Sequence, residues 1–193
     1  MNSLKTTLIA LAAIFMASIS EAGWLIYHEP EFKGPILDYE TKEPIDGAVV
    51  VAVYKKASMG LGAGSIDSII NARETLTDKD GNFRIQSYTT LIQPFSWRIP
   101  TTLIIFKPGY ASAEIGIWHF TGQELKEEQE RGWPWTKDLR FKLRGRGIVE
   151  LPKARTREER WHASFVGVTG YTEKELPLLY KARNEEDNAL RTK

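Results

Sequence analysis

The residues best able to do chemistry in this sequence are tryptophans. Trp133 and Trp135 flank a proline, so a stiff segment holds two indole rings close together. Indole rings that face solvent stack on sugar rings or on the side chains of a peptide. A third tryptophan, Trp97, lies in a long connection between two predicted strands. We therefore take Trp97, Trp133 and Trp135 as a candidate binding surface, the alternative being that such rings pack against the end of the β-structure.

The C-terminal part of the chain supplies further candidates. Two T-x-x-E capping boxes predict two short helices after residue 150. Trp161 and Phe165 are four residues apart in the first, and Leu176 and Tyr180 have the same spacing in the second, so each helix has one apolar stripe. We expect Trp161 and Phe165 to pack against the β-structure, and Leu176 and Tyr180 to face a partner.

No catalytic, cofactor or metal-binding residue is predicted. The chain has no cysteine, which excludes thiol nucleophiles, disulfides and cysteine-ligated metals. His28, His119 and His162 lack the close spacing of a local metal pair. The run Asp78-Lys79-Asp80-Gly81-Asn82 begins like a calcium loop, but Thr89 stands where that loop needs a bidentate glutamate. The run is therefore predicted to be a β-turn.

The elements that must position these residues are mainly β-strands. Residues 48–54 are continuously apolar and rich in valine, as in a central strand that is covered on both faces. Shorter runs alternate apolar and polar residues, which is typical of strands with one wet face. The pattern predicts an antiparallel β-sandwich with a short helical C-terminal tail. Two connections, residues 57–72 and 87–100, are longer than a sandwich needs, and long loops often carry binding sites.

The N-terminus has the features of a secretory signal peptide. Residues 8–19 are apolar, follow Lys5, and precede Ser20-Glu21-Ala22, a small-x-small cleavage site. The apolar stretch is shorter than the ~20 residues of a membrane-spanning helix. We expect residues 1–22 to be cleaved and the mature chain to begin at Gly23, with an uncleaved anchor as the alternative.

Three motifs, in chain order, resemble one known family. They are Gly34, Asp38 and Thr41 with Pro44-Ile45-Asp46-Gly47-Ala48-Val49-Val50, then Thr77-Asp78-Lys79-Asp80-Gly81-Asn82-Phe83, and then Lys107-Pro108-Gly109-Tyr110. Over residues 32–144 the chain resembles the carboxypeptidase regulatory-like domain, which has a transthyretin-like fold. The resemblance implies a seven-stranded antiparallel Greek-key sandwich that serves a structural or binding role. The helical tail lies outside the family's pattern, and the fold alone does not identify the function.

Together these features predict an exported module in three parts. They are a signal peptide (1–22), the sandwich (23–147) and a helical extension (148–193). A net charge of +1 gives no overall field to attract nucleic acid or an anionic membrane. We expect a non-catalytic periplasmic or secreted bacterial protein, without cofactors and without stable membrane insertion after cleavage. It would bind another envelope protein or serve a structural role, the alternative being a carbohydrate-binding module that uses exposed tryptophans.

Overall fold

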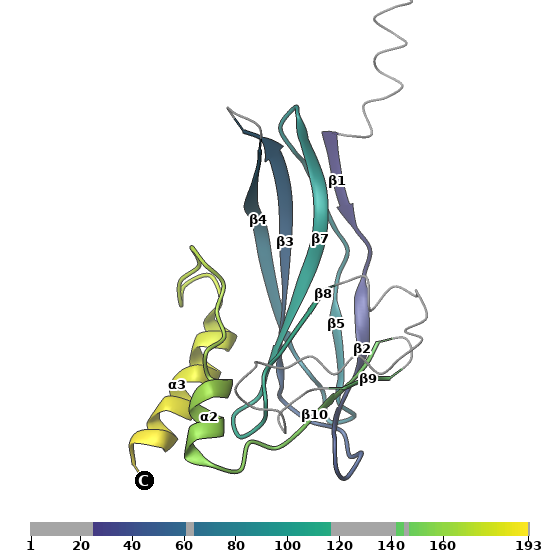
Figure 1. Cartoon of the computed structure of the whole chain (residues 1–193). Helices are drawn as coiled ribbons and strands as arrows, with labels where there is room; N and C mark the ends of the chain where they lie inside the picture. The colour runs from purple at the N-terminus through teal and green to yellow at the C-terminus, as the bar shows by residue number, and fades with distance from the viewer. Residues whose placement is uncertain (1–24, 61–63, 117–141, 145–146, 193) are drawn as a thin grey trace, which may run out of the picture.

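The computed structural model describes residues 25–60, 64–116, 142–144 and 147–192 of the 193-residue chain. Within them the fold is mainly β, as predicted, with ten strands and two helices (Figure 1). In chain order these are β1 (Ile26–Glu29), β2 (Phe32–Asp38), β3 (Val49–Met59), β4 (Ser65–Leu76), β5 (Asn82–Ile85), β6 (Tyr88–Leu91), β7 (Ser96–Phe106), β8 (Ala113–Gly116), β9 (Lys142–Arg144), β10 (Ile148–Leu151), α2 (Arg157–Ala163) and α3 (Pro177–Arg191).

The strands form two sheets of four and one of two. The first four-stranded sheet has the order β5-β2-β10-β9, the second has the order β4-β3-β7-β8, and β1 pairs with β6. Both four-stranded sheets contribute to one buried cluster, which includes Ile36 and Phe83 from the first and Val50 and Leu103 from the second. The two sheets therefore share a hydrophobic core.

The prediction of seven antiparallel strands is not confirmed. The described residues hold ten strands, and β10 pairs with β2 in parallel, with Val149 opposite Ile36. β10 also lies beyond residue 147, where the sandwich was expected to end. Its side chains Val149 and Leu151 are fully buried in the shared core, so this strand is part of the β-structure and the helical extension begins only at α2.

Both predicted long loops contain strand residues. β3 and β4 stay paired out to Met59 and Ser65, with one register shift at Tyr54 and Lys55, so most of the first connection belongs to a long antiparallel hairpin. Its glycines favoured the loop prediction, but the return strand carries β-branched isoleucines that suit a sheet. The second connection contains β6 and the start of β7. Each connection therefore extends the β-structure at one end of the molecule.

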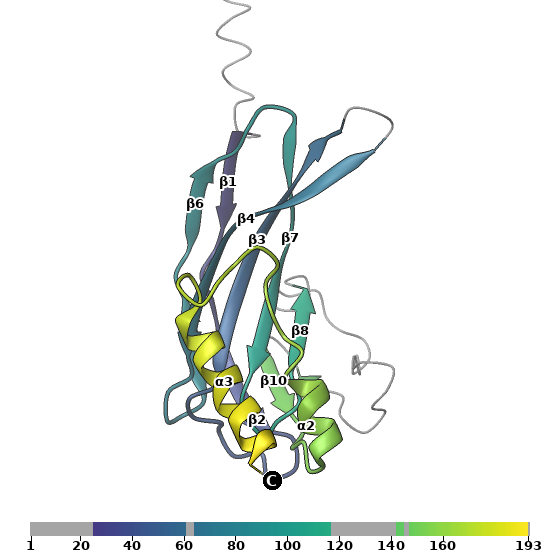
Figure 2. The same cartoon turned by 90° about the vertical axis from the view of Figure 1, so that its left-hand side faces the viewer.

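β3 is covered on both faces, as its uninterrupted apolar sequence predicts. Alternate side chains point to opposite faces of a strand. Val50, Ala52 and Tyr54 belong to the core shared by the two sheets. The other face packs against α3, which lies across it in Figure 2. This second cluster includes Val49, Val51, Val53, Ile104, Phe106, Leu176, Leu179 and Ala182.

The two helices begin in different ways. α2 has the predicted capping box, in which Thr156 Oγ1 accepts a hydrogen bond from the backbone N–H of Glu159 and the Glu159 side chain accepts one from the backbone N–H of Thr156. The second predicted box, Thr172 to Glu175, forms a turn and does not open a helix. α3 begins at Pro177, a residue well suited to the first helical position because it has no N–H to satisfy. The N-terminal N–H groups of α3 bond instead to Glu74 on β4, which accepts from Leu178 (2.7 Å) and Leu179 (3.0 Å).

Candidate functional site

The structure places the predicted site residues in different environments. Trp133 and Trp135 lie outside the described residues. Trp97 is exposed near the start of β7, which leaves it available to a partner. Leu176 is fully buried, and Tyr180 is half-buried and donates a 2.8 Å hydrogen bond to the carbonyl of Tyr171.

The burial of the two tail stripes differs from the prediction. Leu176 lies within the cluster between α3 and β3, so it cannot face a partner. Trp161 and Phe165 are each 52% exposed and contact each other edge-to-face, with ring centroids 4.4 Å apart. The spacing of four residues did predict that these two rings meet. The spacing did not show which stripe would pack on the sheet. That depends on the outer valines of β3, a row long enough to need a long helix such as α3.

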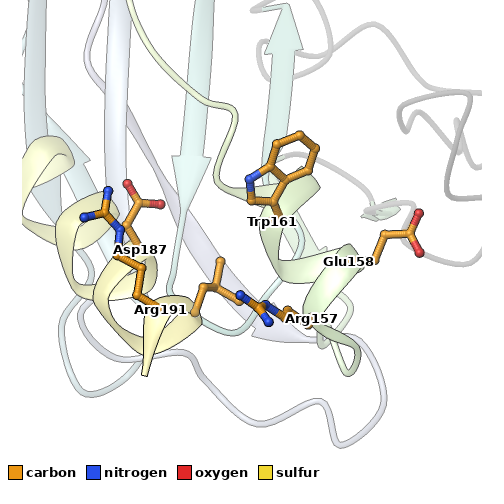
Figure 3. Close-up of a pocket in the computed structure, with 6 residues that line it drawn as sticks. Arg157, Glu158, Trp161, Asp187 and Arg191 are labelled. Carbon is orange, nitrogen blue, oxygen red and sulfur yellow. The ribbon is translucent and has the colours of Figure 1, made fainter. Parts of the chain in front are cut away.

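Trp161 borders a cavity between α2 and α3 of about 580 Å³ (Figure 3). The cavity is lined by Arg157, Glu158, Trp161, Asp187, Leu190 and Arg191. The helices are joined beside it by a bidentate ion pair, in which Arg160 donates to the two carboxylate oxygens of Glu186 at 2.6 and 2.7 Å. Because Glu186 is 1% exposed, this pair fixes the spacing of the helices and so the width of the cavity.

The cavity carries charges that are free to bind. Arg157 and Arg191 are exposed, and within the described residues neither guanidinium forms an ion pair. Arg160 differs, because its hydrogen bonds to Glu186 raise the pKa of its guanidinium and leave it committed to that partner. Planar guanidinium groups bind carboxylates in a bidentate manner, and indole rings bind apolar or sugar surfaces. The cavity, which Glu158 and Asp187 also line, therefore suits a partner that places an apolar group on the indole ring and a carboxylate at Arg157 or Arg191.

A second group of polar side chains surrounds Asp38 at the end of β2. Its carboxylate accepts hydrogen bonds from Tyr110 Oη (3.0 Å) and from the N–H groups of Glu40 (2.8 Å) and Thr41 (3.0 Å), and Lys153 Nζ lies 3.0 Å away. Burial acts to raise the pKa of Asp38, but these bonds outweigh it and lower the pKa to about 2. Burial, together with the bond to Asp38, raises the pKa of Tyr110. Both shifts lead away from neutral pH, whereas acid–base catalysis needs a pKa near the working pH, so the group suits a structural role.

The turn at Asp78 forms as predicted. Asp78 Oδ1 accepts hydrogen bonds from the N–H groups of Asp80 (3.0 Å) and Asn82 (2.8 Å), which is an Asx-type turn. The described residues contain no group of three or more His, Asp or Glu side chains arranged to hold a metal ion. His28 bonds to Thr89, His162 lies on α2 near Glu158, and His119 is outside the described residues.

Comparisons with protein-family models, curated proteins and solved structures find no match to this chain. Among the described helices, none is long and apolar enough to span a membrane.

Proposed function

We propose that this chain is an exported, non-catalytic module that binds another envelope protein through α2 and α3. The observation that carries the proposal is the exposed pair Trp161 and Phe165 beside a cavity with two uncommitted guanidinium groups. Tryptophan and arginine dominate the binding energy of many protein interfaces. Both helices are held in place, α3 by its buried stripe and α2 by the pair of Arg160 and Glu186, so binding would require little ordering of the surface.

The resemblance to carboxypeptidase regulatory-like domains supports a binding role and is part of the proposal. Its three motifs each include a glycine with a positive φ: Gly47 (66°), Gly81 (74°) and Gly109 (82°). The motifs therefore mark turns of a scaffold, which agrees with a sandwich of the transthyretin type.

We also propose export to the periplasm or beyond. Mass spectrometry of the exported protein should find a chain that begins at or near Gly23, and an intact Met1 would contradict cleavage.

The protein partner is tested by capture from envelope extract with four baits. The wild type and Leu76→Ser should retain the same protein, because Leu76 is an exposed apolar residue on β4 that does not line the cavity. Trp161→Ser should lose it. Arg191→Glu should weaken capture and reduce its sensitivity to salt, since the proposed partner supplies a carboxylate. Equal capture by the wild type and Trp161→Ser would show that the helices are not the binding surface.

Glycan binding is the second candidate, and one observation favours it. Trp161 shares its cavity with Glu158 and Asp187, and carboxylates beside an indole ring can bond to sugar hydroxyls while the ring stacks on the sugar. Titration with envelope oligosaccharides should then change tryptophan emission in the wild type and change it less in Trp161→Phe. Emission that responds to no oligosaccharide would exclude this candidate and also the use of Trp133 or Trp135 for stacking.

A further inference from the structure

Most of the exposed apolar side chains gather at one end of the molecule. In the described part of the chain nine large hydrophobic side chains are exposed, and six of them lie at or next to strand termini at this end: Ile26, Met59, Ile66, Leu91, Phe95 and Trp97. In Figures 1 and 2, β1, β4 and β7 begin at this same end and β3 ends there, away from α2. We call these six residues the apolar end. Exposed apolar groups concentrated in this way usually mark an interaction site.

Strand pairing fixes the apolar end rather than leaving it to loose loops. The register places Ile26 directly opposite Leu91, and Ile66 opposite Ser58. The N–H of Met59 donates a 3.1 Å hydrogen bond to the carbonyl of Phe95, which joins the β3–β4 hairpin to the start of β7. The side chains therefore have defined positions relative to one another.

Phe95 is held in an unfavourable backbone conformation. Its φ of 62° lies in the left-handed region, which residues with a bulky side chain rarely adopt, and its side chain is 72% exposed. Such strain persists only where the surrounding structure enforces it, and it is often found at sites of function. Here it accompanies an aromatic ring that is directed toward solvent.

The position of the N-terminus indicates what this surface meets. β1 begins at the apolar end, and only six residues, 20–25, separate Ile26 from the apolar stretch of residues 8–19. The seven Cα–Cα steps from Ile19 to Ile26 span at most about 25 Å. This step rests on the export proposed above: while that stretch lies in a membrane during export, the apolar end is held close to the bilayer surface.

The chemistry of the apolar end also suits a bilayer surface. Tryptophan and phenylalanine favour the interface between lipid headgroups and acyl chains. Lys56 and Arg98 lie beside the apolar residues. Lys56 Nζ bonds to Gln93, and Arg98 Nη1 bonds to the carbonyl of His28 and lies 3.7 Å from the carboxylate of Glu29. Cations at this depth can contact phosphate groups of the headgroups.

We propose that the apolar end rests on the surface of a lipid bilayer, inserting Phe95, Leu91 and Ile66 at headgroup depth. The contact is peripheral and involves no spanning helix. It would keep the mature protein at the membrane after the signal peptide is removed, with α2 and its cavity directed away from the lipid. The inference is independent of the identity of any protein partner of the helices.

Single cysteine labels test the proposal, because the chain has no cysteine of its own. Ile66→Cys and Leu76→Cys place an environment-sensitive fluorophore at opposite ends of β4, on two residues that are both exposed. Leu91→Cys gives a second label at the apolar end. The protein is recovered from the exported fraction and mixed with vesicles of phosphatidylethanolamine and phosphatidylglycerol, or of phosphatidylcholine alone. Labels at 66 and 91 should shift to shorter emission wavelengths and be quenched by brominated lipid, and the label at 76 should not change.

A second set of variants measures what the side chains contribute. In the Ile66→Cys chain, replacing Leu91 and Phe95 with serine should raise the lipid concentration at half-maximal response at least about tenfold. An unchanged midpoint would overturn the proposal. The proposal would also be overturned if the emission of the labels at 66 and 91 did not change with either type of vesicle, or if the labels at all three positions changed alike. A response that needs no lipid and grows with protein concentration would assign the apolar end to a second copy of the chain instead.

Discussion

Asp38 is a buried charge whose neighbours stabilise the ionised form. Because hydrogen bonds lower its pKa from 3.8 to about 2 in the folded protein, the unfolded chain binds a proton at a higher pH than the folded chain does. The ionised carboxylate therefore contributes stability above about pH 4, and this contribution is lost as the pH falls toward 2. We predict that Asp38→Asn lowers the free energy of unfolding by roughly 2 kcal/mol near neutral pH and has little effect near pH 2.

Denaturant unfolding at a series of pH values measures this prediction. Asp67→Asn is the control, because Asp67 is an exposed carboxylate on β4, at the other end of the molecule. The control should keep the wild-type pH dependence between pH 2 and 4. If Asp38→Asn kept it as well, the stabilisation would have to arise elsewhere.

Gly81 illustrates a turn that only glycine fits. Its φ is 74°, and a Cβ atom there would lie 2.6 Å from the carbonyl oxygen of Ile36. Gly109 has a similar φ of 82°, but a Cβ atom on it would meet nothing within 4 Å. Gly81→Ala should therefore destabilise the protein by more than Gly109→Ala, which should lose about 1 kcal/mol from the backbone conformation alone. Thermal unfolding of the two variants gives the comparison, and equal losses would mean that the contact with Ile36 relaxes freely.

The elements that local sequence dictates were predicted, and those that depend on distant partners were not. The valine-rich β3, the turn at Asp78 and the capping box at Thr156 follow from neighbouring residues, and all three are present. The parallel pairing of β10 with β2 joins strands more than a hundred residues apart, so no local pattern reveals it. The cavity between α2 and α3 has the same origin, because it exists only where two separate helices meet.

The N-terminus of α3 is a tertiary cap that sequence alone did not reveal. Its N-cap residue, Leu176, makes no side-chain hydrogen bond to the helix, and the carboxylate of Glu74 on β4 takes that role. Glu74→Gln removes the negative charge that favours a helix N-terminus, so we predict a loss of about 1 kcal/mol and faster hydrogen exchange at Leu178 and Leu179. Glu114→Gln, on the exposed side of β8, should change neither quantity. Unchanged exchange at the two amides would show that α3 is held by its apolar contacts alone.

At the scale of the whole molecule, the structure is layered and its two ends differ. α3 covers the outer face of the β4-β3-β7-β8 sheet, and the inner face of that sheet packs on the other four-stranded sheet. The apolar end and the end that carries α2 lie at opposite extremes of the strands (Figure 1). A protein built in this way could rest one end on a surface and offer the other end to a partner.

The layers make α3 part of the fold, whereas the exposed rings of Trp161 and Phe165 contribute little to it. Ending the chain after Glu175 removes Leu176, Leu179 and Ala182 and uncovers the valines on the outer face of β3. Each large side chain that is buried contributes about 1.5 to 3 kcal/mol, so the truncated protein should have a clearly lower melting temperature, bind a hydrophobic dye and aggregate.

Exchanging Trp161 and Phe165 for serine in the complete chain should alter the free energy of unfolding by less than about 0.5 kcal/mol, since both side chains are half in solvent. Calorimetry and light scattering distinguish the two variants. A truncated chain that stayed monomeric with the wild-type melting temperature would show that the sheets do not need α3. A large loss of stability in the serine variant would show that the aromatic pair is part of the fold and is not available to a partner.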